Sequence, residues 1–259
     1  MRFSSKRIYD YANLKKYTDT YYKLTSMKCF TQPEAESPRE YTPKGEVNEE
    51  KLENNLSRAK SKIFEYAYCN PWELFVTLTL DKKKYDRKDL EKFRKDFAQF
   101  VRDYKKKYGV SVKYLLIPER HKDGAWHMHG FFMGLPQEHL KPFKSSERLP
   151  VKILNRLKNG KQVFTWQAYA EKFGFCDIEL IENQEASSKY IMKYVTKEAQ
   201  RTISELNAHL YYCSQGLKKA EVIHQDILTK PIDNPSYEND YVIVKYFKQA
   251  DEAMDYFVN

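Results

Sequence analysis

The feature that most constrains the fold is the segment Trp126–Met133, in which two histidines flank a methionine just ahead of an apolar run. It reads Trp-His-Met-His-Gly-Phe-Phe-Met, and a short run of this composition between turn signals is typical of a strand. Side chains alternate between the two faces of a strand, so His127 and His129 point one way and Met128 points the other way. Two imidazoles on one face of a sheet form half of a site for a divalent metal ion.

A glutamate eight residues before His127 joins this pair if the chain reverses between them. The segment Lys122–Gly124 fits a three-residue hairpin loop in which the glycine takes the position of positive φ. Residue 119 then lies opposite residue 127, and cross-strand partners share a face of the sheet. Glu119 would therefore lie beside His127 and His129.

Other loop lengths and other ligands stay open at this point. A two-residue loop would shift the pairing by one position and present Arg120 in place of Glu119. His121 has the same parity as Glu119 and is the reserve ligand. Two imidazole nitrogens and one carboxylate oxygen suit Mn²⁺ or Mg²⁺, with coordination positions left for water and a phosphate oxygen. The competing interpretation is that these are ordinary polar side chains on a solvent-facing strand.

The second feature is the segment Gln184–Gln200, which has the pattern of a helix. Residues three and four apart share a helix face, and one such stripe consists of Tyr190, Lys193, Tyr194 and Lys197. A tyrosine hydroxyl has a pKa of about 10, so it becomes a nucleophile only where a cation or base favours the phenolate. A lysine one turn away provides such a cation and can neutralise charge on a phosphate. The alternative is an amphipathic helix with ordinary tyrosines, whose Ile191 and Val195 turn to the core.

Hydrophobic periodicity in the rest of the chain predicts an α+β fold. Short runs rich in β-branched and aromatic residues indicate strands, and stripes with a helical period indicate helices. The expected strands are 74–80, 110–117, 126–133 and 175–181, with further ones at 210–213 and 241–247, and the expected helices are 48–67, 86–107, 165–173 and 184–200. Their order predicts an antiparallel sheet of about five strands with helices packed on one face and the other face open to a ligand.

Changes in composition divide the chain into three parts. Residues 1–50 read as a basic, tyrosine-rich N-terminal arm followed by an acidic linker rich in Pro, Glu and Ser. Residues 51–220 contain the motifs and form the main domain, and residues 221–259 form a C-terminal extension.

The charge balance favours a polyanionic partner. The formal net charge is +9, although a solvated lysine-rich surface would give the same balance. Aromatic residues make up 15% of the chain and offer rings on which unpaired bases could stack. We find no apolar run of about 18 residues to span a membrane and no signal-peptide pattern, so we expect a cytoplasmic protein without a membrane partner.

The four cysteines are far apart in the sequence and include no CxxC pair, which argues against a cysteine-ligated zinc ion. They are Cys29, Cys69, Cys176 and Cys213. We expect free thiols, as is usual in the cytosol.

Three motifs, taken in order, resemble those of the HUH endonucleases. Within that superfamily the chain looks like the tandem-tyrosine replication-associated proteins of small single-stranded DNA phages and rolling-circle plasmids. Phe75–Thr79 resembles the first-strand motif, His127-Met-His129 the histidine-hydrophobe-histidine motif, and Tyr190–Lys197 the tyrosine motif. Tyr211–Lys218 is similar to a segment that follows this helix in phage relatives. The resemblance covers roughly residues 70–220.

The resemblance implies a sheet domain like an RNA-recognition motif that nicks single-stranded DNA at an origin. It implies that a divalent ion at Glu119, His127 and His129 polarises the scissile phosphate. Tyr190 would attack the phosphorus, become linked to the 5′-phosphate and free a 3′-hydroxyl that primes synthesis. Tyr194 would allow a second cleavage while the first tyrosine is occupied.

Supporting roles follow from the same resemblance. Lys193 and Lys197 would steady phosphate charge or assist the tyrosines. Thr77 and Thr79 share a sheet face, where they contact DNA or fill a layer of the fold. Arg120 is the remaining candidate for DNA contact.

The sequence has no G-x-x-x-x-G-K-[ST] motif, so an initiator of this kind would need a separate helicase as well as a polymerase. If a phage encodes the chain, its place of action is the cytoplasm of the host. A mobilisation relaxase or transposase with the same chemistry is the nearest alternative. A non-catalytic single-strand binder and a hydrolytic metal nuclease without a covalent intermediate are more distant ones.

Overall fold

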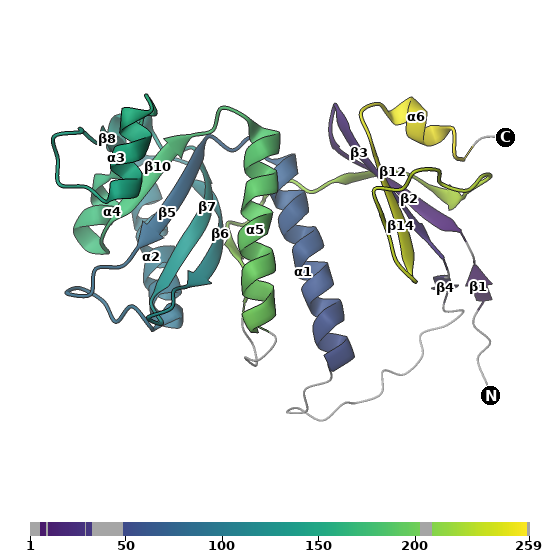
Figure 1. Ribbon diagram of the computed structural model, residues 1–259, viewed down its shortest axis with the longest axis horizontal. Coiled ribbons are helices and arrows are strands. Elements are labelled where there is room, and N and C mark those ends of the chain that lie inside the picture. Colours follow the sequence, from purple (N-terminus) through teal and green to yellow (C-terminus); the bar gives the residue numbers. More distant parts are fainter. Residues whose placement is uncertain (1–5, 9, 29, 33–48, 203–208, 258–259) are drawn as a thin grey trace. The chain divides into compact units, whose positions relative to one another are not determined.

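A computed structural model describes the backbone of residues 6–8, 10–28, 30–32, 49–202 and 209–257 (Figure 1). Side chains are described for residues 10–28, 55–195 and 209–257. The chain forms two units: a large unit of residues 47–217, and a small unit that combines residues 1–46 with residues 218–259.

The large unit is built on a seven-stranded antiparallel sheet in the order β11-β6-β7-β5-β10-β9-β8. Its strands are β5 (Leu74–Thr79), β6 (Lys113–Arg120), β7 (Trp126–Met133), β8 (Leu140–Pro142), β9 (Phe164–Trp166), β10 (Cys176–Leu180) and β11 (Tyr212–Cys213). Its helices are α1 (Glu49–Cys69), α2 (Leu90–Tyr108), α3 (Val151–Lys158), α4 (Gln167–Lys172), α5 (Gln184–Thr202) and the 3₁₀ turn η1 (Gln137–His139).

One face of this sheet packs against α2 and α4. Leu74, Val76 and Leu78 alternate along β5 and are buried against the apolar stripe of α2. Asp89 caps the start of α2 by accepting a hydrogen bond from the Lys92 backbone N–H at 2.9 Å. This face forms the main hydrophobic core of the large unit.

The other face carries α1 and α5, which lie side by side (Figure 1). Ser188 on α5 donates a hydrogen bond to the Ala67 carbonyl of α1 at 2.9 Å. The side-chain amide of Gln184 donates to the carbonyls of Ala67 and Asn70 at 2.8 and 3.1 Å. The predicted α+β class with an antiparallel sheet is confirmed. The sheet is wider than expected, and helices cover part of its second face because Ile117 and Phe131 there are apolar and buried.

The small unit is a five-stranded antiparallel sheet that joins both ends of the chain, in the order β12-β2-β3-β14-β13. Its elements are β2 (Tyr11–Thr18), β3 (Tyr21–Met27), β12 (Glu221–Ile227), β13 (Tyr237–Glu238), β14 (Val242–Phe247) and α6 (Ala250–Met254), with a separate pair of β1 (Lys6–Ile8) and β4 (Phe30–Gln32). The sequence did not reveal this pairing between residues 11–27 and residues after 220, because it depends on contacts about 200 residues apart.

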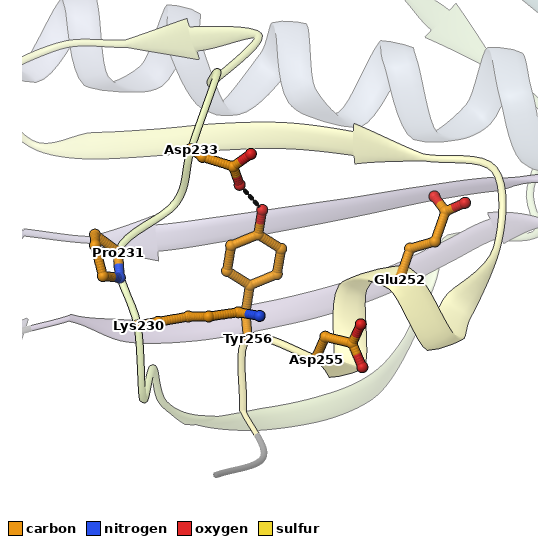
Figure 2. Close-up of a pocket in the computed structure, with 6 residues that line it drawn as sticks. All are labelled: Lys230, Pro231, Asp233, Glu252, Asp255 and Tyr256. Carbon is orange, nitrogen blue, oxygen red and sulfur yellow. Dashed lines mark hydrogen bonds between the residues drawn. The ribbon is translucent and has the colours of Figure 1, made fainter.

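A polar cluster holds the end of the chain onto this sheet. Tyr256 donates a hydrogen bond to the Asp233 carboxylate, as Figure 2 shows. Lys245 donates to the same carboxylate at 2.9 Å, and hydrogen bonds from Lys245 and Tyr256 lower the pKa of Asp233 to about 2. The cluster borders a shallow pocket of about 480 Å³, to which Lys230 and Glu252 also contribute. In the part of the chain that the structure describes, no helix has the length and apolar character needed to cross a membrane.

The cysteines that the structure describes are free thiols, as the sequence predicted. They are Cys69, Cys176 and Cys213. Cys29 lies outside the described residues.

Candidate active site

The hairpin of β6 and β7 has the predicted register. Glu119 lies opposite His127, and Gly124 at the turn has φ +84°. The His121 backbone N–H donates to the Ala125 carbonyl at 2.9 Å and so closes a three-residue loop. Because the loop has three residues, Glu119 shares a sheet face with the histidines. Arg120 points to the opposite face, where its guanidinium lies 5.8 Å from the centre of the Trp126 indole.

Two threonines of β5 hold the histidine rings from the other side. Thr77 pairs with His129 and Thr79 with His127 across the strands. Each hydroxyl oxygen lies near the Nδ1 of its histidine, at 3.3 Å and 3.0 Å respectively. A ring that gives its Nδ1 proton to a threonine keeps the Nε2 lone pair for a ligand. Sequence reasoning placed both threonines on this face but missed this contact, which cross-strand register alone reveals.

Glu119 and His129 form a buried pair. The Nε2 of His129 lies 2.8 Å from a carboxylate oxygen of Glu119, and the two residues are only 7% and 6% exposed, Glu119 given first. The approach lacks the direction of a hydrogen bond, and this nitrogen has no hydrogen-bond partner among the described residues. Buried polar atoms normally have partners, so a nitrogen and a carboxylate that approach in this way fit a shared cation.

The ring of His127 stacks on the ring of His121, with centroids 3.8 Å apart. Burial lowers the pKa of His127 to about 4, and the nearby His121 and His129 lower it further. The imidazole is therefore neutral at pH 7, as a metal ligand must be. Within the described side chains, no three His, Cys, Asp or Glu residues are already assembled into a group that could hold a metal ion. The formed part is the Glu119–His129 pair, with two further imidazoles beside it.

The tyrosines of α5 lie directly over this pair. The ring of Tyr194 stacks on that of His129, with centroids 4.1 Å apart and planes 16° apart. The Tyr190 and Tyr194 hydroxyls are 3.0 Å from each other. Tyr190 is 40% exposed, whereas burial, followed by the hydrogen bond with Tyr190, raises the pKa of the half-buried Tyr194. The predicted stripe therefore brings two phenols to the histidine face.

The lysines of the stripe are less completely described. The ammonium of Lys193 lies 5.3 Å from the centre of the Tyr190 ring and is exposed. The side chain of Lys197 lies outside the described residues. Ile191 and Val195 are fully buried, as the helical pattern predicted.

A cleft of about 940 Å³ extends from the tyrosines and has no counterpart in the sequence prediction. It lies between α5, the end of β10, and α3 with the residues that follow it. The sequence showed only a polar, lysine-rich stretch there. Arg156 of α3 binds the carboxylates of Asp177 and Glu179 on β10, each at 2.8 Å. These distant contacts position the wall of the cleft, so sequence spacing could not have revealed it.

The segment Tyr211–Lys218, which also entered the sequence resemblance, extends the edge of the sheet. Tyr212 pairs with Leu116 of β6. The hydroxyl of Ser214 accepts a hydrogen bond from the Tyr114 backbone N–H at 3.0 Å. Its structural role is thus to add β11 beside β6.

Residues 73–199 match a family of replication-associated proteins, the one named after the ORF2 type. The matched region is slightly less than half of the 259 residues. It begins just before β5 and ends within α5, so it contains every candidate metal, tyrosine and threonine residue named above. The match supports a replication-associated protein. Comparisons with curated proteins and with solved structures gave no match.

Proposed function

We propose that this protein nicks and rejoins single-stranded DNA at a replication origin through a covalent tyrosine–phosphate intermediate, as a rolling-circle initiator of the HUH type. The observation that carries the proposal is the stacking of Tyr194 on His129 at 4.1 Å. It unites the two strongest motifs of the sequence in one site. The match to a replication-associated family supports the same direction, and favours an initiator over a relaxase or transposase.

Tyr190 is the better placed of the two phenols to attack DNA. It is 40% exposed and borders the cleft, whereas Tyr194 is half-buried and its pKa is raised. Its phenolic oxygen would attack the scissile phosphorus while the bond from phosphorus to the 3′-oxygen breaks. The phenol loses its proton, the leaving 3′-oxygen gains one, and the 5′-phosphate stays on Tyr190.

The neighbouring groups each have a part in this step. A divalent ion, Mn²⁺ or Mg²⁺, held by Glu119, His127 and His129 would supply Lewis-acid polarisation of the phosphate. The exposed ammonium of Lys193 would offset phosphate charge beside Tyr190. Lys197 is proposed for the same task on the sequence pattern alone.

The phosphotyrosine bond conserves the energy of the broken phosphodiester. A later 3′-hydroxyl can therefore attack the phosphorus, release Tyr190 and close a DNA circle. The hydroxyl of Tyr194, 3.0 Å from that of Tyr190, is placed to take part in a second cleavage. Because the sequence lacks a P-loop motif, we propose that a separate helicase and a polymerase act with it.

A labelled origin strand, Mn²⁺ and a denaturing gel test the proposal. A covalent protein–DNA band that disappears with EDTA is the expected result. Cleaved DNA without such a band would mean a hydrolytic nuclease. Intact DNA that binds the protein would mean a non-catalytic single-strand binder.

A further inference from the structure

We infer that the cleft beside the tyrosines holds nucleotides of single-stranded DNA next to the scissile phosphate and reads their bases. The inference rests on the proposed function, since it assigns the cleft to the same substrate. Thr77, Tyr190 and Tyr194 are among the lining residues, so the cleft is continuous with the candidate active site. Its volume of about 940 Å³ lies within the range of ligand-binding clefts.

Part of the lining offers exposed apolar and aromatic surface. Leu180, at the end of β10, and Tyr190 are each 40% exposed. The ring of Phe75 meets that of Tyr190 edge-on, with centroids 5.5 Å apart. Exposed rings and aliphatic groups beside a basic rim are the surfaces on which unpaired bases stack.

The facing wall carries groups that suit base edges and phosphates. Asn159, Lys161 and Gln162 follow α3, line the cleft and are exposed. A side-chain amide has donors and an acceptor in one plane, so it can match the polar edge of a base. The ammonium of Lys161 lies 3.7 Å from Glu179 and its side chain remains 60% exposed, which leaves it accessible to a phosphate.

This wall is fixed before any DNA arrives. Arg156 ties α3 to Asp177 and Glu179 of β10, so its guanidinium serves the fold rather than a phosphate. The turn after α3 is closed by a hydrogen bond from the Gly160 N–H to the Leu157 carbonyl at 3.0 Å. A wall held in this way loses little conformational entropy on binding, and that favours discrimination between bases.

Sequence preference is the direct test. The full-length protein and the double variant Asn159→Ala, Gln162→Ala are incubated with Mn²⁺ and short single-stranded oligonucleotides of random sequence. The covalent adducts are then sequenced. We expect the double variant to relax the base preference beside the nick about tenfold, because each lost base contact is worth about 1–3 kcal/mol. Adduct yield should stay within about threefold of the wild type, since neither residue belongs to the tyrosine site.

The matched control is Asn155→Ala, which removes an exposed amide from α3 outside the cleft. It should leave the preference unchanged. An unaltered preference in the double variant, or an equal relaxation in the control, would overturn the inference.

A second measurement separates failure of the cleft from failure of the nicking chemistry. Binding of a fluorescent oligonucleotide of the same random library is followed by anisotropy in EDTA. Lys161→Glu should weaken binding about fivefold, and Lys158→Glu, on the same helix but outside the cleft, by clearly less. If the wild type forms no adduct, the proposed function fails, while a selective loss in Lys161→Glu still supports the cleft. Equal losses in the two variants overturn it.

Discussion

At the scale of single residues, the orientation of two imidazoles decides whether the site can work. Thr77 and Thr79 contact the Nδ1 atoms of His129 and His127 and so direct their Nε2 atoms away from β5. Such outer partners fix the tautomer and the ring angle of a metal ligand. The threonines of the first motif therefore act through the histidines.

This arrangement predicts a loss of metal affinity without a loss of fold. Thr79→Val should weaken Mn²⁺ binding about tenfold, the lower end of the usual effect of such partners. Titration calorimetry of the DNA-free protein measures it. Thr25→Val, the same change in a strand of the small unit, is the control. Equal Mn²⁺ affinity in both variants would show that Thr79 does not orient His127.

Cys176 gives a second residue-scale prediction. It is fully buried, and burial raises the pKa of its thiol from 9.0 to about 11. The folded state therefore retains this proton, and its contribution to stability is complete below pH 9 and is lost as the pH rises toward about 11. At about pH 8, iodoacetamide should leave Cys176 unmodified in the native protein and modify it in urea. Peptide mass spectrometry shows which occurs, and rapid labelling of the native protein would contradict its burial.

At the scale of elements, the hairpin and α5 make the site, and the hairpin depends on the absence of one side chain. A Cβ at Gly130 of β7 would overlap the carbonyl oxygen of Leu115 on β6. Neighbouring backbones cannot yield to such an overlap without breaking the ladder that aligns Glu119 with His127.

Gly130→Ala should therefore destabilise the protein by about 3 kcal/mol or more, in the range of severe overpacking. Gly109→Ala is the contrast, because Gly109 ends α2 at φ +66° with open space around it. Its cost should be about 1 kcal/mol, that of a left-handed conformation alone. Urea unfolding monitored by circular dichroism compares the two. Similar midpoints would refute the packing account of Gly130.

The same elements show what the sequence could and could not predict. Local patterns sufficed for β7, the Lys122–Gly124 turn and α5, because each depends on alternation, a glycine or a helical period. The contacts of Thr79 and the position of α3 depend on neighbours distant in sequence. Arg156 of α3 meets β10 about 20 residues later, and the small unit pairs residues at opposite ends of the chain.

At the scale of the whole molecule, the net charge of +9 favours a polyanion over any one sequence. Phosphate contacts release counterions, so binding should weaken linearly on a log–log plot against salt concentration. For about five contacts with single-stranded DNA, the slope should be roughly −3 to −4. Fluorescence anisotropy at several NaCl concentrations measures it. A flat response would exclude a DNA groove lined by lysines.

The account depends most on Tyr190 as the group that joins the DNA. The direct test compares the wild type, Tyr190→Phe and Tyr194→Phe for covalent adducts on an origin strand with Mn²⁺. We expect Tyr190→Phe to remove the adduct, Tyr194→Phe to retain the first cleavage, and peptide mapping to find the nucleotide on Tyr190. An adduct that survives in Tyr190→Phe at the wild-type level, or cleavage by the wild type with no adduct at all, would contradict the account.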